Sequence, residues 1–155
     1  MKKIIRLTES DLTRIIKRVI SEKQYLTEQN AVGDYFNTMN STFNPQIAAY
    51  AKTGLNLPVK LQLNSDGTVS ILWNNVKSFT TTSSLSQAIT YNDGAADPKS
   101  KITQFGNEMS TGWQKVAQAS QNKDVQKSNT AVSAAIKSSI NSIISTYFKN
   151  QPTQK

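Results

Sequence analysis

The sequence predicts an α+β protein: an N-terminal amphipathic helix, then a small domain in which a short antiparallel sheet packs against helices. Three patterns lead to this prediction. Apolar residues recur at helical spacing near the N-terminus, alternate with polar residues around a central turn, and return to helical spacing in the last third of the chain. The length of 155 residues suits one hydrophobic core with an appendage. We therefore expect a leader helix and connector at 1–28 and a small polar domain at 29–155.

The leader carries the clearest local pattern. Between about Thr8 and about Lys23, Thr8 and Asp11 have the spacing of a capping box, which favours a helix start at this point. Large aliphatic residues then recur at positions that share one face of a helix, and we name this set the docking face: Leu12, Ile15, Ile16, Val19 and Ile20. A partner protein that covered this face would hold the leader.

The residues after the leader are expected to form a connector and two short helices. The stretch Gln24–Gly33 is mostly polar and is predicted to be the connector. A helix is predicted over Asp34–Phe43. Asn44 and Pro45 are typical of the N-cap and first position of another helix, which we expect to end at Gly54.

The central segment changes to the alternating pattern of strands. It predicts a β-hairpin over 59–73, closed by the turn at 64–67. Asn74 and Asn75 indicate a second turn that leads to a third strand at 76–82. A fourth strand is expected at 86–91.

The last third of the chain predicts two long helices. The first begins at Pro98 and has one apolar stripe, which Gly106 and Gly112 are expected to break. The second runs from about Asp124 to about Lys149, with apolar residues along one side and Ser, Asn, Gln and Lys on the other.

The composition excludes several functional classes. The chain contains no Cys and no His, so it lacks the usual ligands of structural zinc and the nucleophile systems that need either residue. Carboxylates remain, but the spacing of Asp34, Asp97 and Glu108 does not bring them together as a catalytic pair. We expect no enzyme activity, no cofactor and no metal.

Two further motifs are interpreted as structural. Trp73 and Trp113 could stack on a ligand, but aromatic residues at strand and helix spacing more often belong to the core, which is the interpretation we favour. Asp66 and Gly67 resemble part of a cation-binding loop but lack further acidic ligands, so a turn is the better interpretation.

The positive charge suggests contact with nucleic acid as an alternative. The net charge is +8, and residues 29–155 hold eleven Lys against six acidic residues. Candidate phosphate contacts are Lys99, Lys101, Lys115, Lys123 and Lys127. The competing interpretation is a solvated lysine surface, and the absence of Arg after Arg18 argues against specific base recognition.

Export and membrane insertion are not expected. Charged residues from Arg6 to Arg18 interrupt the apolar positions of the leader, unlike the continuous apolar region of a signal peptide. No segment approaches the length of a membrane span. The leader could lie on an anionic lipid surface, but its acidic residues and its lack of Trp and Phe oppose that alternative.

The leader also resembles known sequences. The run KKIIRLTESDLTRIIKRVISE is similar to leaders found on many proteins of tailed phages, especially marine and gut-associated ones. In T-even-like phages, comparable segments load internal proteins into the prohead, and a prohead protease then cuts after a Leu or Ile, any residue, and Glu. Three sites match this pattern here: Leu7-Thr8-Glu9, Ile20-Ser21-Glu22 and Leu26-Thr27-Glu28. The last lies in the expected connector, so a cut after Glu28 would release the domain.

The resemblance implies a non-enzymatic internal or structural protein of the virion. Its leader would dock on a phage head or scaffold protein, and the protein would be located in the phage head or the host cytoplasm. The alternative is a basic nucleic-acid-binding or host-interacting module with an N-terminal docking helix. A further interpretation of the leader is that its apolar face simply packs on its own domain.

Overall fold

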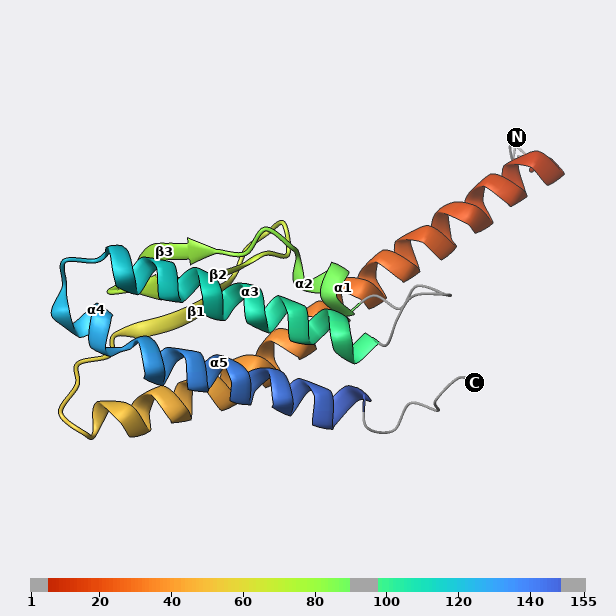
Figure 1. Cartoon of the computed structure of the whole chain (residues 1–155). Coiled ribbons are helices and arrows are strands. Elements are labelled where there is room, and N and C mark those ends of the chain that lie inside the picture. Colours follow the sequence, from red (N-terminus) through yellow and green to blue (C-terminus); the bar gives the residue numbers. More distant parts are fainter. Residues whose placement is uncertain (1–5, 90–97, 149–155) are drawn as a thin grey trace.

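The computed structural model describes residues 6–89 and 98–148, with the backbone alone at 24–29 and at position 98. It confirms the predicted α+β class. The elements are α1 (Glu9–Ala51), β1 (Val59–Leu63), β2 (Val69–Trp73), β3 (Val76–Thr80), α2 (Leu85–Ile89), α3 (Pro98–Ala119), α4 (Lys123–Lys127), α5 (Asn129–Ile143) and the π-helical turn η1 (Ile144–Phe148). Figure 1 shows a body built from the sheet, α3, α5 and the second half of α1, while the first half of α1 projects away from it.

Helix α1 replaces the three separate segments expected at the N-terminus. It runs for 43 residues, so the connector predicted at Gln24–Gly33 was wrong. Half of the residues of that stretch are good helix formers: Gln24, Leu26, Glu28, Gln29 and Ala31. The polarity of this stretch therefore did not indicate a break in the helix.

The new helix start expected at Pro45 was also wrong, because Pro45 lies inside α1. A proline removes one N–H from the helix and disfavours its interior. Here Phe43 and Ile47 stand on either side of it and are both buried in the core. We attribute the continuity of the helix to this packing, which holds the chain helical on both sides of the proline.

The sheet is antiparallel with strand order β1-β2-β3. The predicted hairpin is confirmed, with Val59 opposite Trp73 at one end. In its turn the Gly67 N–H donates to the carbonyl of Asn64 at 3.0 Å, and Gly67 has a φ of +81°. The second turn is confirmed as well, and β3 ends at Thr80, two residues earlier than expected.

The fourth strand expected at 86–91 was wrong, because residues Leu85–Ile89 form helix α2; positions 90 and 91 lie outside the described residues. Ser84 and Gln87 make a capping box at its start. The Gln87 N–H donates to Ser84 Oγ, and the Ser84 N–H donates to Gln87 Oε1, each at 3.2 Å. This reciprocal pair fixes a helical turn where the apolar pattern alone suggested a strand.

Helix α3 follows the prediction but is not broken at its glycines. A Cβ on Gly106 would come within 2.6 Å of Ile140 Cγ1, and a Cβ on Gly112 would overlap the ring of Phe79. At these two glycines, side chains of α5 and β3 lie close against the backbone of α3. Their role is packing against neighbours and not interruption of the helix.

The single helix expected from Asp124 to Lys149 is divided in the structure; Lys149 itself lies outside the described residues. Asn122 caps α4 through its side-chain oxygen, which accepts from the Asp124 N–H at 2.8 Å. Buried Ser128 separates α4 from α5 and donates to the carbonyl of Val125 at 2.6 Å. The apolar side of the segment faces the core as predicted.

The core lies between the sheet and the helices and includes both tryptophans. Trp73 and Trp113 are buried and stack with their ring centroids 6.0 Å apart and an interplanar angle of 27°. The structural interpretation of these residues is therefore confirmed. At the other side of the core, Tyr35 of α1 packs on Tyr147 with centroids 4.2 Å apart, which ties α1 to the C-terminal segment.

Candidate functional site

The docking face on the first half of α1 is exposed to solvent. The exposed fractions of its residues are 46% for Leu12, 46% for Ile15, 55% for Ile16, 56% for Val19 and 51% for Ile20. Among the described residues, the other large apolar side chains with such exposure are Leu7 and Val76. A concentration of apolar surface of this kind is typical of an interaction site. The interpretation in which the leader packs on its own domain is therefore wrong.

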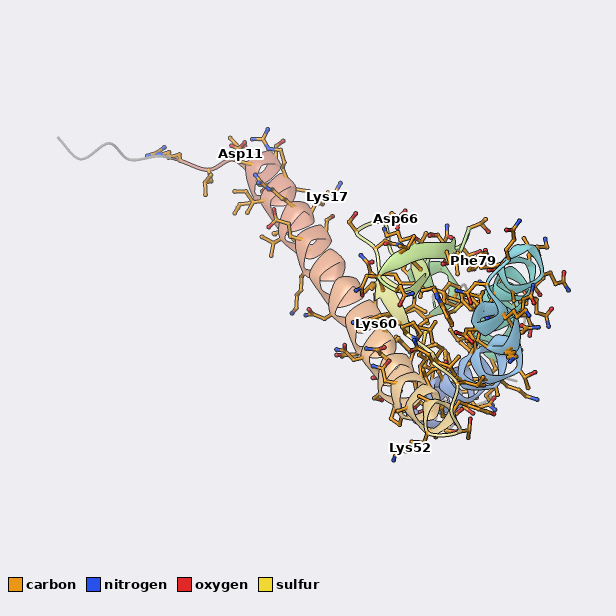
Figure 2. The ribbon with its side chains drawn as sticks, turned by 90° about the vertical axis from the view of Figure 1, so that its left-hand side faces the viewer. Asp11, Lys17, Lys52, Lys60, Asp66 and Phe79 are labelled. Carbon is orange, nitrogen blue, oxygen red and sulfur yellow. The ribbon has the colours of Figure 1, made fainter. Side chains whose placement is uncertain are left out.

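The docking face and the core-facing side of α1 lie on opposite sides of the helix. At 3.6 residues per turn, the mean direction of the docking face is roughly 160° away from that of the residues packed on the core. Those packed residues are Val32, Tyr35, Phe36, Met39, Phe43, Ile47 and Tyr50. A continuous helix cannot turn both faces to the same body. Figure 2 shows Asp11 and Lys17 on the part of α1 that stands clear of the body, far from Lys52.

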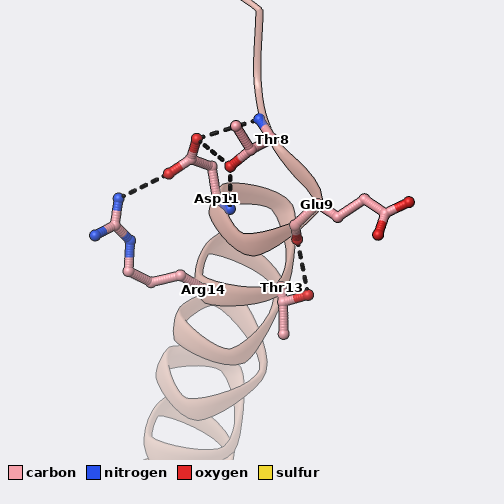
Figure 3. A network of polar contacts seen from close by, with 5 residues as sticks. All are labelled: Thr8, Glu9, Asp11, Thr13 and Arg14. Atoms are coloured by element: carbon pink, nitrogen blue, oxygen red, sulfur yellow. Dashed lines mark hydrogen bonds and ion pairs between the residues drawn. The ribbon is translucent and has the colours of Figure 1, made fainter.

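The start of α1 is specified by its own residues (Figure 3). Thr8 Oγ1 accepts from the Asp11 N–H at 3.2 Å, and the Asp11 carboxylate accepts from both the N–H and the hydroxyl of Thr8, so the predicted capping box is confirmed. These hydrogen bonds lower the pKa of Asp11 from its ordinary value. Arg14 adds an ion pair to Asp11 at 3.2 Å. The start of the helix that carries the docking face is therefore fixed by local hydrogen bonds and not by contacts with the body.

A second ion pair lies further along the same segment. Arg18 Nε donates to Glu22 Oε1 at 3.0 Å, four residues away. Exposed pairs of this spacing stabilise a helix by about 0.3–0.5 kcal/mol each. They offset part of the conformational entropy that the projecting segment loses in becoming helical.

The candidate processing site Leu26, Thr27 and Glu28 falls within α1. The structure describes the backbone at these positions as helical but not their side chains. The described α1 residues that pack on the core begin at Val32, so a cut after Glu28 would remove none of the described core residues. Because proteases act on locally opened backbone, the helix would need to unwind around Glu28 before cleavage.

The structure does not gather the five candidate phosphate-binding lysines into one cluster. On α3, Lys99 and Lys101 point to roughly opposite sides of the helix at 3.6 residues per turn. Lys115 lies sixteen residues after Lys99, which is an axial rise of roughly 24 Å. Lys123 and Lys127 belong to the separate short helix α4. DNA binding stays a prediction.

The carboxylates do not assemble a catalytic pair in the described part of the chain. Asp34 lies on α1 and Glu108 on α3, and Asp97 falls outside the described residues. Glu108 Oε1 accepts from the N–H of Thr82 and, at 2.6 Å, from its hydroxyl. Partial burial raises the pKa of Glu108, but hydrogen bonds from Thr82 and Ser83 outweigh burial and lower the pKa overall. Glu108 thus anchors the loop between β3 and α2.

Within residues 6–89 and 98–148, no cluster of three or more potential metal ligands occurs. None of the helices described is sufficiently long and apolar to traverse a membrane.

Comparison with known proteins gives no match to a protein family, a curated protein or a solved structure. The class of this protein is therefore defined by its fold and its exposed docking face alone. The chain is a small α+β protein that presents an apolar docking face on a helix projecting from its body.

Proposed function

We propose that this chain is a non-enzymatic internal or structural protein of a phage virion, delivered to the head by its N-terminal helix. The observation that carries the proposal is the exposure of the docking face on a helix whose start is capped by its own side chains. A delivery segment needs a surface that a partner can reach while the cargo stays folded. Because the docking face and the core lie on opposite sides of α1, a partner can reach the docking face while the body stays folded.

Two further observations support the same function. The leader resembles phage leaders over residues 2–22, and a match to the prohead protease pattern ends at Glu28, four residues before Val32, the first of the described α1 residues that pack on the core. A protein cut there would lose its docking face and keep all of the described core residues. Residues 29–155 would keep a surplus of five positive charges, which suits a protein enclosed with DNA.

The proposed contact is a helix in a groove of a head or scaffold protein. Residues at i, i+3, i+4, i+7 and i+8 are the usual anchors of such binding. The five residues of the docking face are each about half exposed, so covering each fully would contribute about 1 kcal/mol before the entropic cost of association. The resulting affinity is modest, which suits a contact that many copies make at once inside a prohead.

The direct test is intact mass and N-terminal mapping of the protein recovered from purified phage particles, beside the recombinant full-length chain. A mature chain that begins at Gln29 is the expected result. Absence of the protein from particles, or an uncut form found only in infected cells, would contradict the proposal.

Matched variants separate docking from cleavage. Ile16→Asp should prevent incorporation into particles, because it places a charge at the centre of the docking face. Ser21→Asp is the control, since it adds the same charge on the opposite side of the same helix. Glu28→Gln should leave incorporation intact and abolish the mature chain that begins at Gln29. Equal incorporation of the Ile16→Asp and Ser21→Asp proteins would argue against docking through this face.

A further inference from the structure

We propose that, in the free protein, the docking face is covered by the same face of a second copy, in an antiparallel pair whose two-fold axis passes through Ile16. This inference goes beyond the delivery function, because it concerns the protein before it meets a head partner. The same surface would serve both contacts. Self-association and delivery would therefore compete.

Three residues of the face, Leu12, Ile16 and Ile20, are spaced symmetrically about Ile16, so they match one another when one copy is reversed. With Ile16 opposite Ile16, Leu12 lies opposite Ile20, four residues from the centre in each direction. Glu9 lies seven residues before Ile16, and Lys23 lies seven residues after it. Each is about one helical turn beyond the apolar residues and on the same side of the helix as the docking face. An antiparallel pair thus brings Glu9 of each copy to Lys23 of the other.

A parallel pair lacks this complementarity. It would place Glu9 beside Glu9 and Lys23 beside Lys23, and like charges at such positions are destabilising. The ion pairs of Arg14 with Asp11 and of Arg18 with Glu22 form within one copy, so they do not distinguish the two arrangements. The charges at the two ends of the face therefore select the antiparallel arrangement.

The shape of the molecule leaves room for this pair. The docking face points roughly 160° away from the side of α1 that packs on the core, so the body does not stand in front of it. Val32, the first described residue of α1 that packs on the core, lies roughly 24 Å along the helix from Ile16. Figure 1 shows the first half of α1 standing away from the body. In an antiparallel pair the two bodies would lie at opposite ends.

The size of the contact predicts a weak and reversible dimer. Each copy contributes five half-exposed aliphatic side chains, which places the interface at or below the small end of specific protein contacts. We expect a dissociation constant on the order of 10 µM. Anionic lipid is the less favoured occupant, because Glu9 lies on the same side as the apolar residues and the described part of the face has no aromatic anchor.

Sedimentation of the full-length protein is the first test. At about 100 µM the chain should be mostly dimeric, given the expected affinity. Ile16→Asp should be monomeric and Ser21→Asp should remain dimeric. A full-length chain that stays monomeric at this concentration would overturn the inference, even if the monomer binds phosphatidylserine vesicles.

Cysteine cross-linking tests the register, and the absence of native Cys makes single substitutions clean. A mixture of Leu12→Cys and Ile20→Cys proteins should form a disulfide-linked heterodimer under mild oxidation. Leu12→Cys alone should remain largely uncross-linked. The opposite result, with Leu12→Cys linking to itself and not to Ile20→Cys, would indicate a parallel pair and exclude the proposed one.

Charge reversal completes the test. Glu9→Lys and Lys23→Glu should each weaken the dimer roughly tenfold by creating two like-charge contacts. The double variant should restore dimerisation, and failure to do so would contradict the proposed contacts. A monomeric chain that is still found processed in particles would overturn this inference alone. A dimeric chain that never enters particles would overturn only the delivery function.

Discussion

Phe79 of β3 lies against the backbone of Gly112 in α3 so closely that a Cβ on Gly112 would overlap its aromatic ring. This contact packs the edge strand β3 against α3, and Figure 2 shows Phe79 on the sheet side of the molecule. The glycine is needed for space and not for an unusual backbone angle, since its φ is not positive.

Gly112→Ala should therefore destabilise the protein, although alanine is the better helix former. We expect a loss of about 1–3 kcal/mol in the free energy of unfolding, because the ring of Phe79 must move out of a packed position. Gly33→Ala is the matched control. Gly33 lies inside α1, where a Cβ would meet no neighbouring side chain within 4 Å, so this change should stabilise by about 0.4–1 kcal/mol. Urea unfolding measures both, and equal effects would contradict the assigned contact.

Acid should weaken the anchor between Glu108 and Thr82. Because hydrogen bonds hold the pKa of Glu108 below its ordinary value of 4.5, the folded state stabilises the ionised form. This stabilisation is fully present above about pH 4.5 and is lost as the pH falls through the lower, folded-state pKa. Glu108→Gln should thus be less stable than the original chain at pH 7, and the difference should shrink toward pH 3.

The measurement is urea unfolding of both proteins at several pH values. Glu9→Gln serves as the control, because Glu9 is exposed on the projecting segment. It should leave the unfolding of the body nearly unchanged at pH 7. A difference between Glu108→Gln and the original chain that stays constant with pH would show that the carboxylate does not act through its charge.

The turn between β2 and β3 should depend on residues that accept positive φ. Asn74 and Asn75 have φ values of 50° and 63°, as in a two-residue hairpin turn. Asn75→Ala should lower the melting temperature, at a cost of about 1 kcal/mol. Asn75→Gly should leave it unchanged or higher. Calorimetry checks this order, and an alanine variant as stable as the glycine variant would refute it.

A chain that begins at Gln29 should fold. The described residues of α1 that contact the core start at Val32, so the cut removes the exposed docking face and no described part of the core. We expect the same near-ultraviolet circular dichroism from the stacked tryptophans and a melting temperature within about 5 °C of the full chain. Loss of the tryptophan signal would show that the leader supports the body.

Local sequence was sufficient wherever a few neighbouring residues determine a structure. The capping box of Thr8 and Asp11, the turn at Gly67 and the alternation around the hairpin all act over a few residues, and each was predicted. The capping box of Ser84 and Gln87 was also present in the sequence. That cap specifies a helical turn over a few residues, and the predicted strand at 86–91 did not take it into account.

The sequence by itself determined the docking face: its residues, its helical spacing and the cap that starts its helix. Only the tertiary structure decided that this face is exposed. The decision depends on the continuity of α1, since an unbroken helix that turns Met39 and Phe43 into the core must turn Leu12 and Ile16 away from it. With a flexible connector in place of residues 24–33, the leader could have folded back onto the body. Helical rigidity over that stretch is the physical reason why it does not.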